Sequence, residues 1–579
     1  MKPTVLDRKQ VATVLEEIGA LLELKGENPF KARAYLAAAR ALDALEEDLG
    51  TLLAEGRLRG VKGIGEAISA KITTLATTGR LPYHDDLRRE IPAGLLEMIQ
   101  VPGLGPRRAR VLHQKLGIDS VDGLAEACRA GRLAGLGGFG AASQEKILQG
   151  IAFVKRHVGY MLLSDATRLA HALVQEVSSL QGVSHVQSAG SLRRRKELVR
   201  DIDLLASHKK GSRPEAILRR FTRLPSVRQV LGAGETKASV LTDDGRQVDL
   251  RVVSETELPF ALLYFTGSAD HNIALRRRAQ SMGLKINEYG LWQGTRRLAC
   301  RDEAAIFARL GLAFIPPELR EDWGEIEAAA SGELPDLVRL EDLRGVLHVH
   351  TNWSDGTDTL EDMVKVAAER GDTFVGISDH SRTAAYAGGL SLERVAEQRR
   401  ALAALRRRYT KLTILHGTES DILKDGSLDY PAEVLDAFDF VIGSVHSHFS
   451  LPEQEQTARV VRAIANPHLT CVGHPTGRLL LQREGFSLDM EKVMDAAARH
   501  GKLIELNAQP HRLDIDWRAC RRAAQKGVKV SINPDAHSLE EMEQTSYGID
   551  TARRGWLTAR DVANTRPWKE IRALAGSRA

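Results

Sequence analysis

Gly190 to Asp203 have the sequence GSLRRRKELVRDID, and this stretch decides the fold. It begins with a glycine and a serine, continues through a basic run and ends with two aspartates one residue apart. Apolar and charged residues alternate from residue 200 to 205, which predicts a β-strand with Asp201 and Asp203 on one face. Two carboxylates this close repel each other unless cations lie between them, so the pair indicates either a divalent-metal site or a solvated strand edge.

A third acid, Asp249, lies in a second alternating segment, residues 247–253. If the two strands are neighbours, the three carboxylates converge and can hold two Mg²⁺ about 3.5 to 4 Å apart, an arrangement suited to phosphoryl transfer. Gly190 and Ser191 would then offer a close backbone approach and a hydroxyl to phosphate oxygens, and Arg194 a planar guanidinium. The alternative, a basic loop before a surface strand, leaves the spacing unexplained.

These strings resemble the nucleotidyltransferase palm of the family X DNA polymerases, the family that includes DNA polymerase beta. A further stretch, residues 264–289, resembles the thumb of that family. The resemblance implies that the three aspartates are catalytic and bind two Mg²⁺ or Mn²⁺, and that Arg276 contacts DNA in the template minor groove. It implies a nucleotide-binding set made of Gly190, Ser191, Arg194, Tyr264, Phe265, Gly267 and Asn272.

Some positions leave alternatives open. Packing in a hydrophobic core is the alternative role for Tyr264 and Phe265. Ala269 replaces the aspartate that follows Gly-Ser in polymerase beta, and Arg200 replaces a small residue before the first catalytic aspartate. At these two positions the sequence departs from the polymerase beta pattern.

Length and composition set outer bounds. A chain of 579 residues predicts two to four domains, and contents of 43% hydrophobic and 27% charged residues are typical of a soluble globular protein. We find no run of about 18 apolar residues and no apolar signal region at the amino terminus, so we expect a cytoplasmic protein with no membrane association. The four cysteines lie far apart without a CxxC motif, which indicates neither a zinc ribbon nor disulfides.

The formal net charge of +5 is too small to indicate nucleic-acid binding by itself, so local motifs must carry that argument. Gly-x-Gly turns precede helical stretches at Gly63 and Gly65 and at Gly103 and Gly105, and a looser third turn follows at residues 136–140. Such a turn exposes backbone N–H groups at the positive end of a helix and can hold a phosphate. A plain helix connector is the alternative, but the repetition resembles helix-hairpin-helix motifs, which contact the DNA backbone without reading bases.

Lys71 follows the first of these turns, at the position where the lyase domain of family X polymerases carries its Schiff-base lysine. A lysine whose pKa is lowered by its surroundings can attack the aldehyde of an abasic sugar. The alternative is a surface lysine that contacts phosphate. Ala67 stands where polymerase beta has another lysine, so Lys71 alone matches the lyase pattern.

The carboxy-terminal part is rich in histidine, with 11 of the 18 histidines beyond residue 344. Short apolar segments there predict strands that end in possible metal ligands, with helical stretches between them. Seven such strand-helix repeats predict a parallel barrel whose mouth is the active site. The candidate ligands are His348, His350, Asp355, His380, Glu419, His446, His474, Asp535 and His537.

Nine ligands are too many for one zinc ion, so we expect a cluster of two or three Mn²⁺, Zn²⁺ or Fe ions that hydrolyses phosphoesters. A single histidine at a strand end is usually structural, but the repetition at successive strands favours a metal site. The strings HVHTNWSDG, SDHS, GTE, VHSH, GHP and NPDAH resemble the polymerase and histidinol phosphatase (PHP) domain, with its nine metal positions intact. His416 and His448 do not match ligand positions.

We therefore expect a multidomain chain with helical helix-hairpin-helix domains at the amino terminus, an α/β nucleotidyltransferase palm and thumb, and a carboxy-terminal (β/α)7-type barrel. The expected bounds are 1–80 for a lyase-like domain, 81–157 for a fingers-like domain, 158–254 for the palm, 255–317 for the thumb, 318–344 for a linker and 345–579 for the PHP barrel.

The resemblance to bacterial family X polymerases implies a monomeric DNA-directed DNA polymerase that fills short gaps during base excision repair. Its partners would be gapped or nicked double-stranded DNA and deoxynucleoside triphosphates. The barrel would be a metal-dependent 3′–5′ exonuclease that could also cut beside abasic sites. The alternatives are a template-independent nucleotidyltransferase, a DNA-bound protein whose barrel is a small-molecule phosphatase, and a non-catalytic scaffold for DNA ends.

Overall fold

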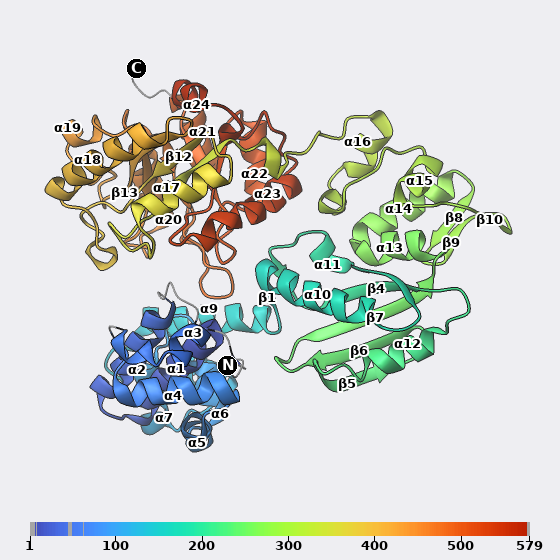
Figure 1. Cartoon of the computed structure of the whole chain (residues 1–579), viewed down its shortest axis with the longest axis horizontal. Coiled ribbons are helices and arrows are strands. Elements are labelled where there is room, and N and C mark those ends of the chain that lie inside the picture. The colour runs from blue at the N-terminus through green and yellow to red at the C-terminus, as the bar shows by residue number, and fades with distance from the viewer. Residues whose placement is uncertain (1–5, 7, 44–48, 62, 576–579) are drawn as a thin grey trace. The chain divides into compact units, whose positions relative to one another are not determined.

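The computed structural model describes residues 6, 8–43, 49–61 and 63–575, and the chain divides into two compact units at Val158 and Gly159 (Figure 1). The domain bounds expected inside each unit stay predictions. None of the helices in these described ranges combines the length and the apolarity that a membrane crossing requires.

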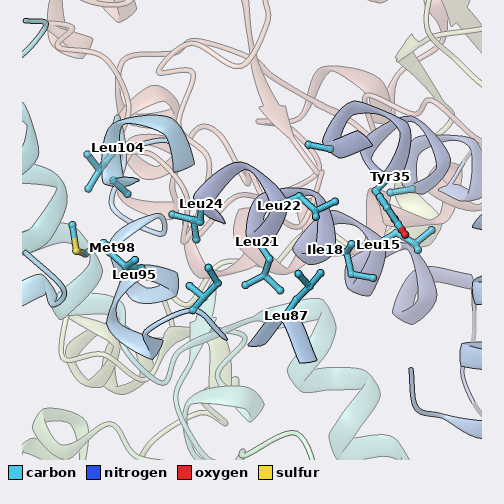
Figure 2. Close-up of a cluster of buried hydrophobic side chains, with 14 of the residues drawn as sticks. Leu15, Ile18, Leu21, Leu22, Leu24, Tyr35, Leu87, Leu95, Met98 and Leu104 are labelled. Atoms are coloured by element: carbon cyan, nitrogen blue, oxygen red, sulfur yellow. The ribbon is translucent and has the colours of Figure 1, made fainter. Parts of the chain in front are cut away.

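The first unit is helical. Its helices are α1 (Arg8–Lys25), α2 (Pro29–Asp43), α3 (Leu49–Ala54), η1 (Arg57–Gly60), α4 (Glu66–Thr78), α5 (Pro82–Glu90), α6 (Ala93–Met98), α7 (Pro106–Leu116), α8 (Val121–Arg129) and α9 (Ala141–His157). Leu15, Ile18 and Leu22 of α1 recur every three or four residues and are buried, as an amphipathic helix requires. Figure 2 shows them with Leu87 and Met98 in one core. The same core contains Ile64 and Leu104, which belong to the first and second Gly-x-Gly turns.

The second unit begins with the palm, a five-stranded sheet in the order β2-β4-β7-β6-β5. Its elements are β1 (Met161–Leu162), α10 (Leu163–Ser178), β2 (Val183–Ser188), α11 (Gly190–Arg193), β3 (Leu198–Val199), β4 (Ile202–His208), α12 (Pro214–Phe221), β5 (Val227–Ala233), β6 (Lys237–Thr242) and β7 (Gln247–Ser254). Strand β4 runs parallel to β7, and the pairing places Asp203 directly beside Asp249. The two alternating segments are therefore neighbours, as the sequence predicts, although β4 begins one residue after Asp201.

The thumb follows the palm. It consists of α13 (Leu258–Thr266), α14 (Ala269–Ser281), β8 (Leu284–Asn287), β9 (Gly290–Gln293), β10 (Arg296–Leu298) and α15 (Glu303–Arg309), and the three strands form an antiparallel sheet. The connecting segment contains η2 (Pro317–Leu319), α16 (Glu325–Ser331) and η3 (Leu340–Asp342). Ile326 and Ala329 of α16 pack into the thumb core, so part of this connection is folded against the thumb.

The carboxy-terminal part is a nearly closed barrel of seven parallel strands in sequential order. The strands are β11 (Gly345–Val349), β12 (Phe374–Ile377), β13 (Thr413–Asp421), β14 (Phe440–Ser444), β15 (Cys471–Val472), β16 (Leu503–Asn507) and β17 (Val530–Asn533). The larger helices between and after them are α17 (Leu360–Glu369), α18 (Leu392–Arg408), α20 (Glu453–Ile464), α21 (Met490–His500), α22 (Trp517–Gln525), α23 (Thr545–Arg554) and α24 (Trp568–Leu574). A parallel bridge from Val349 of β11 to Ala536, which lies just after β17, links the two ends of the sheet.

The inside of the barrel is packed with side chains. Phe440 of β14 belongs to a buried cluster with Leu347 and Phe374. A Cβ atom on Gly417 would lie 2.3 Å from the ring of Phe440, and one on Gly376 would lie 2.6 Å from it. Two neighbouring strands therefore need glycine at this level so that one aromatic ring can fill the space between them.

Candidate active sites in the palm and the barrel

The palm brings its three aspartates together. Asp201, Asp203 and Asp249 each offer a carboxylate oxygen, and these oxygens lie within 4.8 Å of one another. Burial, followed by the charges of Asp201 and Asp249, raises the pKa of Asp203 to about 7. Burial and the neighbouring charges together make three ionised carboxylates unfavourable here without cations, and the donor set of carboxylate oxygens fits divalent metals.

Lys237 of β6 supplies a charge that the sequence reading missed. Its Nζ lies 2.7 Å from Oδ2 of Asp249. Burial favours the neutral form of Asp249, but hydrogen bonds led by that of Lys237 outweigh burial and lower the pKa of the carboxyl. Lys237 lines one pocket with Asp203, Asp249 and Phe265. The antiparallel pairing of β6 with β7 faces Lys237 with Arg251, and sequence spacing alone does not reveal that pairing.

Gly190 has a role in this cluster that is specific to glycine. Its φ angle is +59°, and a Cβ atom there would lie 2.0 Å from Oδ2 of Asp203. A side chain at position 190 would therefore collide with a carboxylate of the proposed metal site. The sequence reading assigned Gly190 to a close phosphate approach, whereas the close approach in the structure is to Asp203.

Two other expected nucleotide-binding residues, Ser191 and Arg194, follow Gly190 closely in the chain. Ser191 is half-buried in α11. Arg194 donates from Nε to Oε1 of Glu321 at 3.0 Å and from Nη1 to the carbonyl oxygen of Thr266. Gly267 gives Arg194 room, since a Cβ atom on Gly267 would lie 3.0 Å from Nη1. The triphosphate would therefore have to compete with Glu321 for Arg194.

The two aromatics before Gly267 stand at the edge of the core. Tyr264 and Phe265 are half-buried and meet edge to face, with their ring centroids 5.1 Å apart. Asn272 donates from Nδ2 to the carbonyl oxygen of Tyr264 at 2.7 Å. Asn272, Tyr264 and the exposed Arg276 line one pocket of the thumb. Partial exposure leaves both a ligand contact and core packing open for the aromatics.

Buried charges that the sequence reading missed hold the thumb against the palm. Arg193 forms paired hydrogen bonds with Glu303 at 3.0 and 2.6 Å and donates to Oγ1 of Thr266 at 2.6 Å. Arg320, which is fully buried, donates from Nη1 to Oε1 of Glu303 at 2.6 Å, the oxygen that also accepts from Nη1 of Arg193. Glu303 and Arg320 come from segments that carry no recognisable motif, so their partnership appears only in three dimensions.

In the first unit, Gly65 and Gly105 are the N-cap residues just before α4 and α7, and Gly63 and Gly103 have φ angles of +97° and +82°. The Gly-x-Gly turns therefore open helices as the sequence predicts. Lys71 donates from Nζ to the hydroxyl of Tyr35 at 2.7 Å and lies 4.5 Å from the centre of the Tyr83 ring. Its ammonium group is thus held between two tyrosines.

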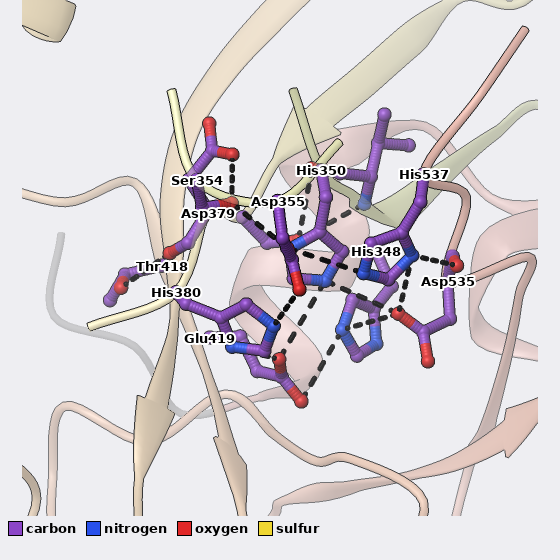
Figure 3. A network of polar contacts seen from close by, with 12 residues as sticks. His348, His350, Ser354, Asp355, Asp379, His380, Thr418, Glu419, Asp535 and His537 are labelled. Carbon is purple, nitrogen blue, oxygen red and sulfur yellow. Dashed lines mark hydrogen bonds and ion pairs between the residues drawn. The ribbon is translucent and has the colours of Figure 1, made fainter. Parts of the chain in front are cut away.

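The mouth of the barrel gathers the expected metal ligands (Figure 3). Three sets of ligand atoms, each within 4.8 Å, cover eight of the nine predicted residues: His350 with Asp355, His380 and His537; His348 with His350 and Asp535; and His380 with Glu419 and His446. The ninth, His474, lies with Nε2 2.9 Å from Oε1 of Glu419. The ligands that the sequence placed at successive strand ends therefore meet in one place.

Three observations indicate that this cluster fits cations. Within the described part of the chain, the ring nitrogens His348 Nε2, His350 Nε2 and His474 Nδ1 are buried without a hydrogen-bond partner, which is costly unless a metal takes that place. The backbone also accepts strain here, since His474 and Asp535 have φ angles of +23° and +50°. Burial, followed by the charges of His537 and His380, lowers the pKa of His350 to about 3, so this imidazole is in the neutral form that binds metal.

Residues behind the ligands orient them, and the sequence reading did not assign these. His348 places Nδ1 2.7 Å from Oε1 of Glu505, and His446 places Nδ1 2.7 Å from Oδ1 of Asp421. Asn507 donates from Nδ2 to Oδ2 of Asp535 at 2.9 Å. Carboxylates that fix the second nitrogen of a ligating histidine are usual in metal sites. An acid inside an apolar strand, as at Glu505, was the available sequence clue.

His416, which matched no ligand position, has a structural role. Its Nε2 lies 3.1 Å from Oε1 of Gln398, and Gln398 donates from Nε2 to Oδ2 of Asp379 at 2.6 Å. Asp379 in turn accepts from the backbone N–H of Thr351 at 2.8 Å and from the hydroxyl of Ser354 at 2.6 Å. This chain of contacts braces the loop that carries His350 and Asp355.

Comparisons with known proteins match these parts. Family models described as a helix-hairpin-helix domain, a SAM-like helix-hairpin-helix tandem, the DNA polymerase beta thumb and the PHP domain match residues 7–81, 95–152, 261–321 and 347–509. Among curated relatives, the DNA polymerase/3′-5′ exonuclease PolX of Bacillus subtilis is 34% identical over 98% of this chain and 99% of its own length.

Two other relatives cover parts of the chain. DNA polymerase lambda of Arabidopsis thaliana is 23% identical over 48% of this chain and 56% of its own length. A probable phosphatase of a Thermoanaerobacter species is 28% identical over 28% of this chain and 69% of its own length. Fold and sites thus define a nucleotidyltransferase of the polymerase beta type joined to a metal-binding PHP barrel. The chain belongs to the bacterial PolX group of the family X DNA polymerases.

Proposed function

We propose that this chain is a template-directed DNA polymerase that fills short gaps, with a 3′–5′ exonuclease in its barrel. The observation that carries the proposal is the presence of two separate clusters of possible metal ligands. One consists of carboxylates at the β4–β7 pair, and the other consists of carboxylates and imidazoles at the barrel mouth. A full-length relative named as both polymerase and exonuclease supports it.

In the palm, Asp201, Asp203 and Asp249 would hold two Mg²⁺ or Mn²⁺, which supply charge neutralisation at the phosphoryl group being transferred. Ser191 and Arg194 hold the triphosphate, and the half-buried Tyr264 and Phe265 lie beside the sugar. Gly190 keeps space for the Asp203 carboxylate. The 3′ hydroxyl of the primer then displaces pyrophosphate from the α-phosphate.

In the barrel, the nine ligands would hold two or three Mn²⁺, Zn²⁺ or Fe ions, which supply a hydroxide nucleophile for phosphoester hydrolysis. Glu505 and Asp421 keep two of the ligating imidazoles in the required tautomer and orientation. The helix-hairpin-helix turns and Arg276 contact DNA. We further propose that the chain acts as a monomer in the cytoplasm on gapped or nicked duplexes.

A reciprocal experiment tests the assignment of two sites. A labelled primer in a gapped duplex is incubated with deoxynucleotides and Mg²⁺ or Mn²⁺, and its length is followed in both directions. Asp201→Ala with Asp203→Ala abolishes extension and leaves shortening; His348→Ala with His350→Ala does the reverse. If either folded double variant lost both activities, the assignment of two independent sites would be wrong.

A second candidate function for the barrel is hydrolysis of small phosphomonoesters, favoured by the likeness to probable phosphatases over this region. Such an enzyme would cleave a chromogenic monoester and leave a DNA 3′ end intact. Cutting beside abasic sites is tested on the same duplexes with a single abasic residue.

A further inference from the structure

The basic loop that follows α11 is held by the barrel. Arg194 to Glu197 contact residues that follow them in sequence by as many as 360 positions. All of these residues belong to the second compact unit. The loop that is proposed to hold the triphosphate therefore owes part of its conformation to a domain with a different proposed activity.

Arg554, at the end of α23, makes the most direct contact. It donates from Nη1 to the carbonyl oxygen of Arg194 at 2.6 Å and to Oε1 of Glu321 at 3.2 Å. The same carboxylate oxygen accepts from Nε of Arg194 at 3.0 Å. Arg554 is 3% exposed and lies 5.2 Å from the centre of the Trp517 ring, so its position is fixed by packing. One carboxylate is thus shared between a barrel arginine and a palm arginine.

The helix that carries Arg554 presents a continuous face to the palm. Tyr547, Asp550 and Arg554 follow one another at intervals of three and four, which places them on one side of a helix. Tyr547 packs against the hydrophobic core of the palm, and Oδ1 of Asp550 lies 3.6 Å from Nε of Arg195. Arg195 has a φ angle of +57°, an unfavourable conformation that such contacts help to maintain.

A second barrel arginine holds the other end of the loop. Arg478 donates from Nη2 to Oε1 of Glu197 at 2.6 Å and from Nε to the carbonyl oxygen of Arg512 at 2.8 Å. The side chain of Arg512 lies 3.7 Å from the metal-ligand candidate Asp535. Because Arg478 also supports the barrel mouth, Arg554 gives the cleaner test of the loop.

We propose that Arg554 is a positioning residue for nucleotide addition, acting on the triphosphate through Arg194 and Glu321. It fixes the backbone of Arg194, and it stays paired with Glu321 when the guanidinium of Arg194 turns to the triphosphate. Without Arg554, Arg194 would be the remaining arginine hydrogen-bonded to the poorly solvated Glu321, beside the weaker charge interaction with Lys196, and Glu321 would hold Arg194 away from the nucleotide. The inference rests on the proposed function, in which Arg194 binds the triphosphate.

The test is steady-state kinetics of gap filling by the full chain. Arg554→Met raises KM for the deoxynucleotide roughly tenfold, the scale of one charge-assisted contact, and changes kcat less. Arg553→Met is the matched control, because Arg553 lies on the same helix and pairs with Glu318 at 2.7 Å without touching the loop; its KM stays within about twofold. Barrel activity on a DNA 3′ end is unchanged in both variants, which shows that both fold.

Two further variants separate positioning from general support. Arg554→Lys keeps a cation beside Glu321, so its KM lies between the values of Arg554→Met and the wild type. Adding Glu321→Gln to Arg554→Met also lowers KM, because no carboxylate then competes for Arg194. An unchanged KM in Arg554→Met, an equal rise in Arg553→Met, or no recovery with Glu321→Gln would overturn the inference. A wild-type chain that adds no nucleotide would instead overturn the proposed function itself, and with it this inference.

Discussion

Gly190 and Asp203 lie so close together that a methyl group on the glycine would stand 2.0 Å from a carboxylate oxygen of the aspartate. The palm therefore places a residue without a side chain next to the aspartate whose pKa is raised to about 7. This contact joins the first residue of the GSLRRRKELVRDID stretch to its last, because α11 and β3 turn the chain back onto the start of β4.

Replacing Gly190 by alanine tests this contact. We expect Gly190→Ala to lower the rate of nucleotide addition by about 100-fold or more, since a displaced Asp203 misplaces the proposed metal site. Gly211→Ala is the control: Gly211 also has a positive φ, +86°, but no described atom lies within 4 Å of its added Cβ. Extension by Gly211→Ala should stay near wild type; equal losses in both variants would mean that backbone strain, and not the collision, is the cause.

Glu419 is the acid at the centre of the barrel cluster. Its carboxylate lies 2.9 Å from both His380 and His474 and 3.3 Å from His446. We expect Glu419→Gln to lower the metal content of the purified protein and to abolish shortening of a DNA 3′ end, while gap filling continues. Elemental analysis measures the metal. His468→Ala, which removes a histidine paired with Asp436 outside the cluster, should keep a wild-type metal content.

Replacing Tyr386 tests whether the barrel acts on DNA 3′ ends as a nuclease or on small monoesters as a phosphatase. The side chain is 72% exposed, and its ring lies 6.4 Å from that of His380 and 6.5 Å from that of His446. An exposed ring at this place can stack on a terminal base, a contact that contributes about 1–3 kcal/mol. Tyr386→Ala should slow hydrolysis of a DNA 3′ end at least tenfold and leave hydrolysis of a small monoester within threefold. Tyr386→Phe should behave like wild type, and equal losses on both substrates would argue against stacking.

Lys71 is tested by chemical trapping. With borohydride and an incised abasic duplex, the wild-type chain should form a covalent DNA adduct that Lys71→Ala does not form. Lys31 is a suitable control because its Nζ also faces the Tyr83 ring, at 5.5 Å, and Lys31→Ala should still be trapped. An adduct that persists in Lys71→Ala, or none with wild type, would remove Lys71 as the nucleophile.

Asp550 gives a stability prediction that depends on pH. Burial raises the pKa of this carboxyl to about 6, although Arg195 opposes the rise. Because the folded pKa lies above the unfolded one, the folded state favours the protonated form, and stability is lost as the pH rises from about 4 through 6. Asp550→Asn should therefore raise the melting temperature at pH 8 by a few degrees, with about half that gain at pH 5. A gain that does not change with pH would contradict the assigned cause.

The sequence was most informative where a short motif repeats a simple geometry. Period two in residues 247–253 predicted that Asp249 lies on one face of a strand, and the family resemblance implied that it joins Asp201 and Asp203. Strand ends with histidine predicted the barrel cluster. The prediction of the strand was less accurate at its start, since Asp201 precedes β4 while its carboxylate still joins the cluster.

Contacts between distant segments could not be predicted in this way. Lys237 lies beside Asp249 because of an antiparallel register, and Arg554 meets Arg194 across 360 positions. Neither Lys237 nor Arg554 belongs to a recognisable sequence motif. Because a charged residue is usually exposed to solvent, the sequence did not indicate that either one has a buried partner. The bracing of His350 through Asp379 and His416 was likewise hidden, because each residue contributes one link of a chain assembled only by folding.

The aromatic ring of Phe440 packs against Gly376 and Gly417 and fills the interior of the barrel at this level. No strand of nucleic acid can thread through it from one end to the other. Any DNA terminus that reaches the ligands must enter through the mouth of the barrel, and the released nucleotide must leave through the same opening. Because the site has a single entrance, the DNA end must withdraw or shift after each cut so that the released nucleotide can leave before the next cut.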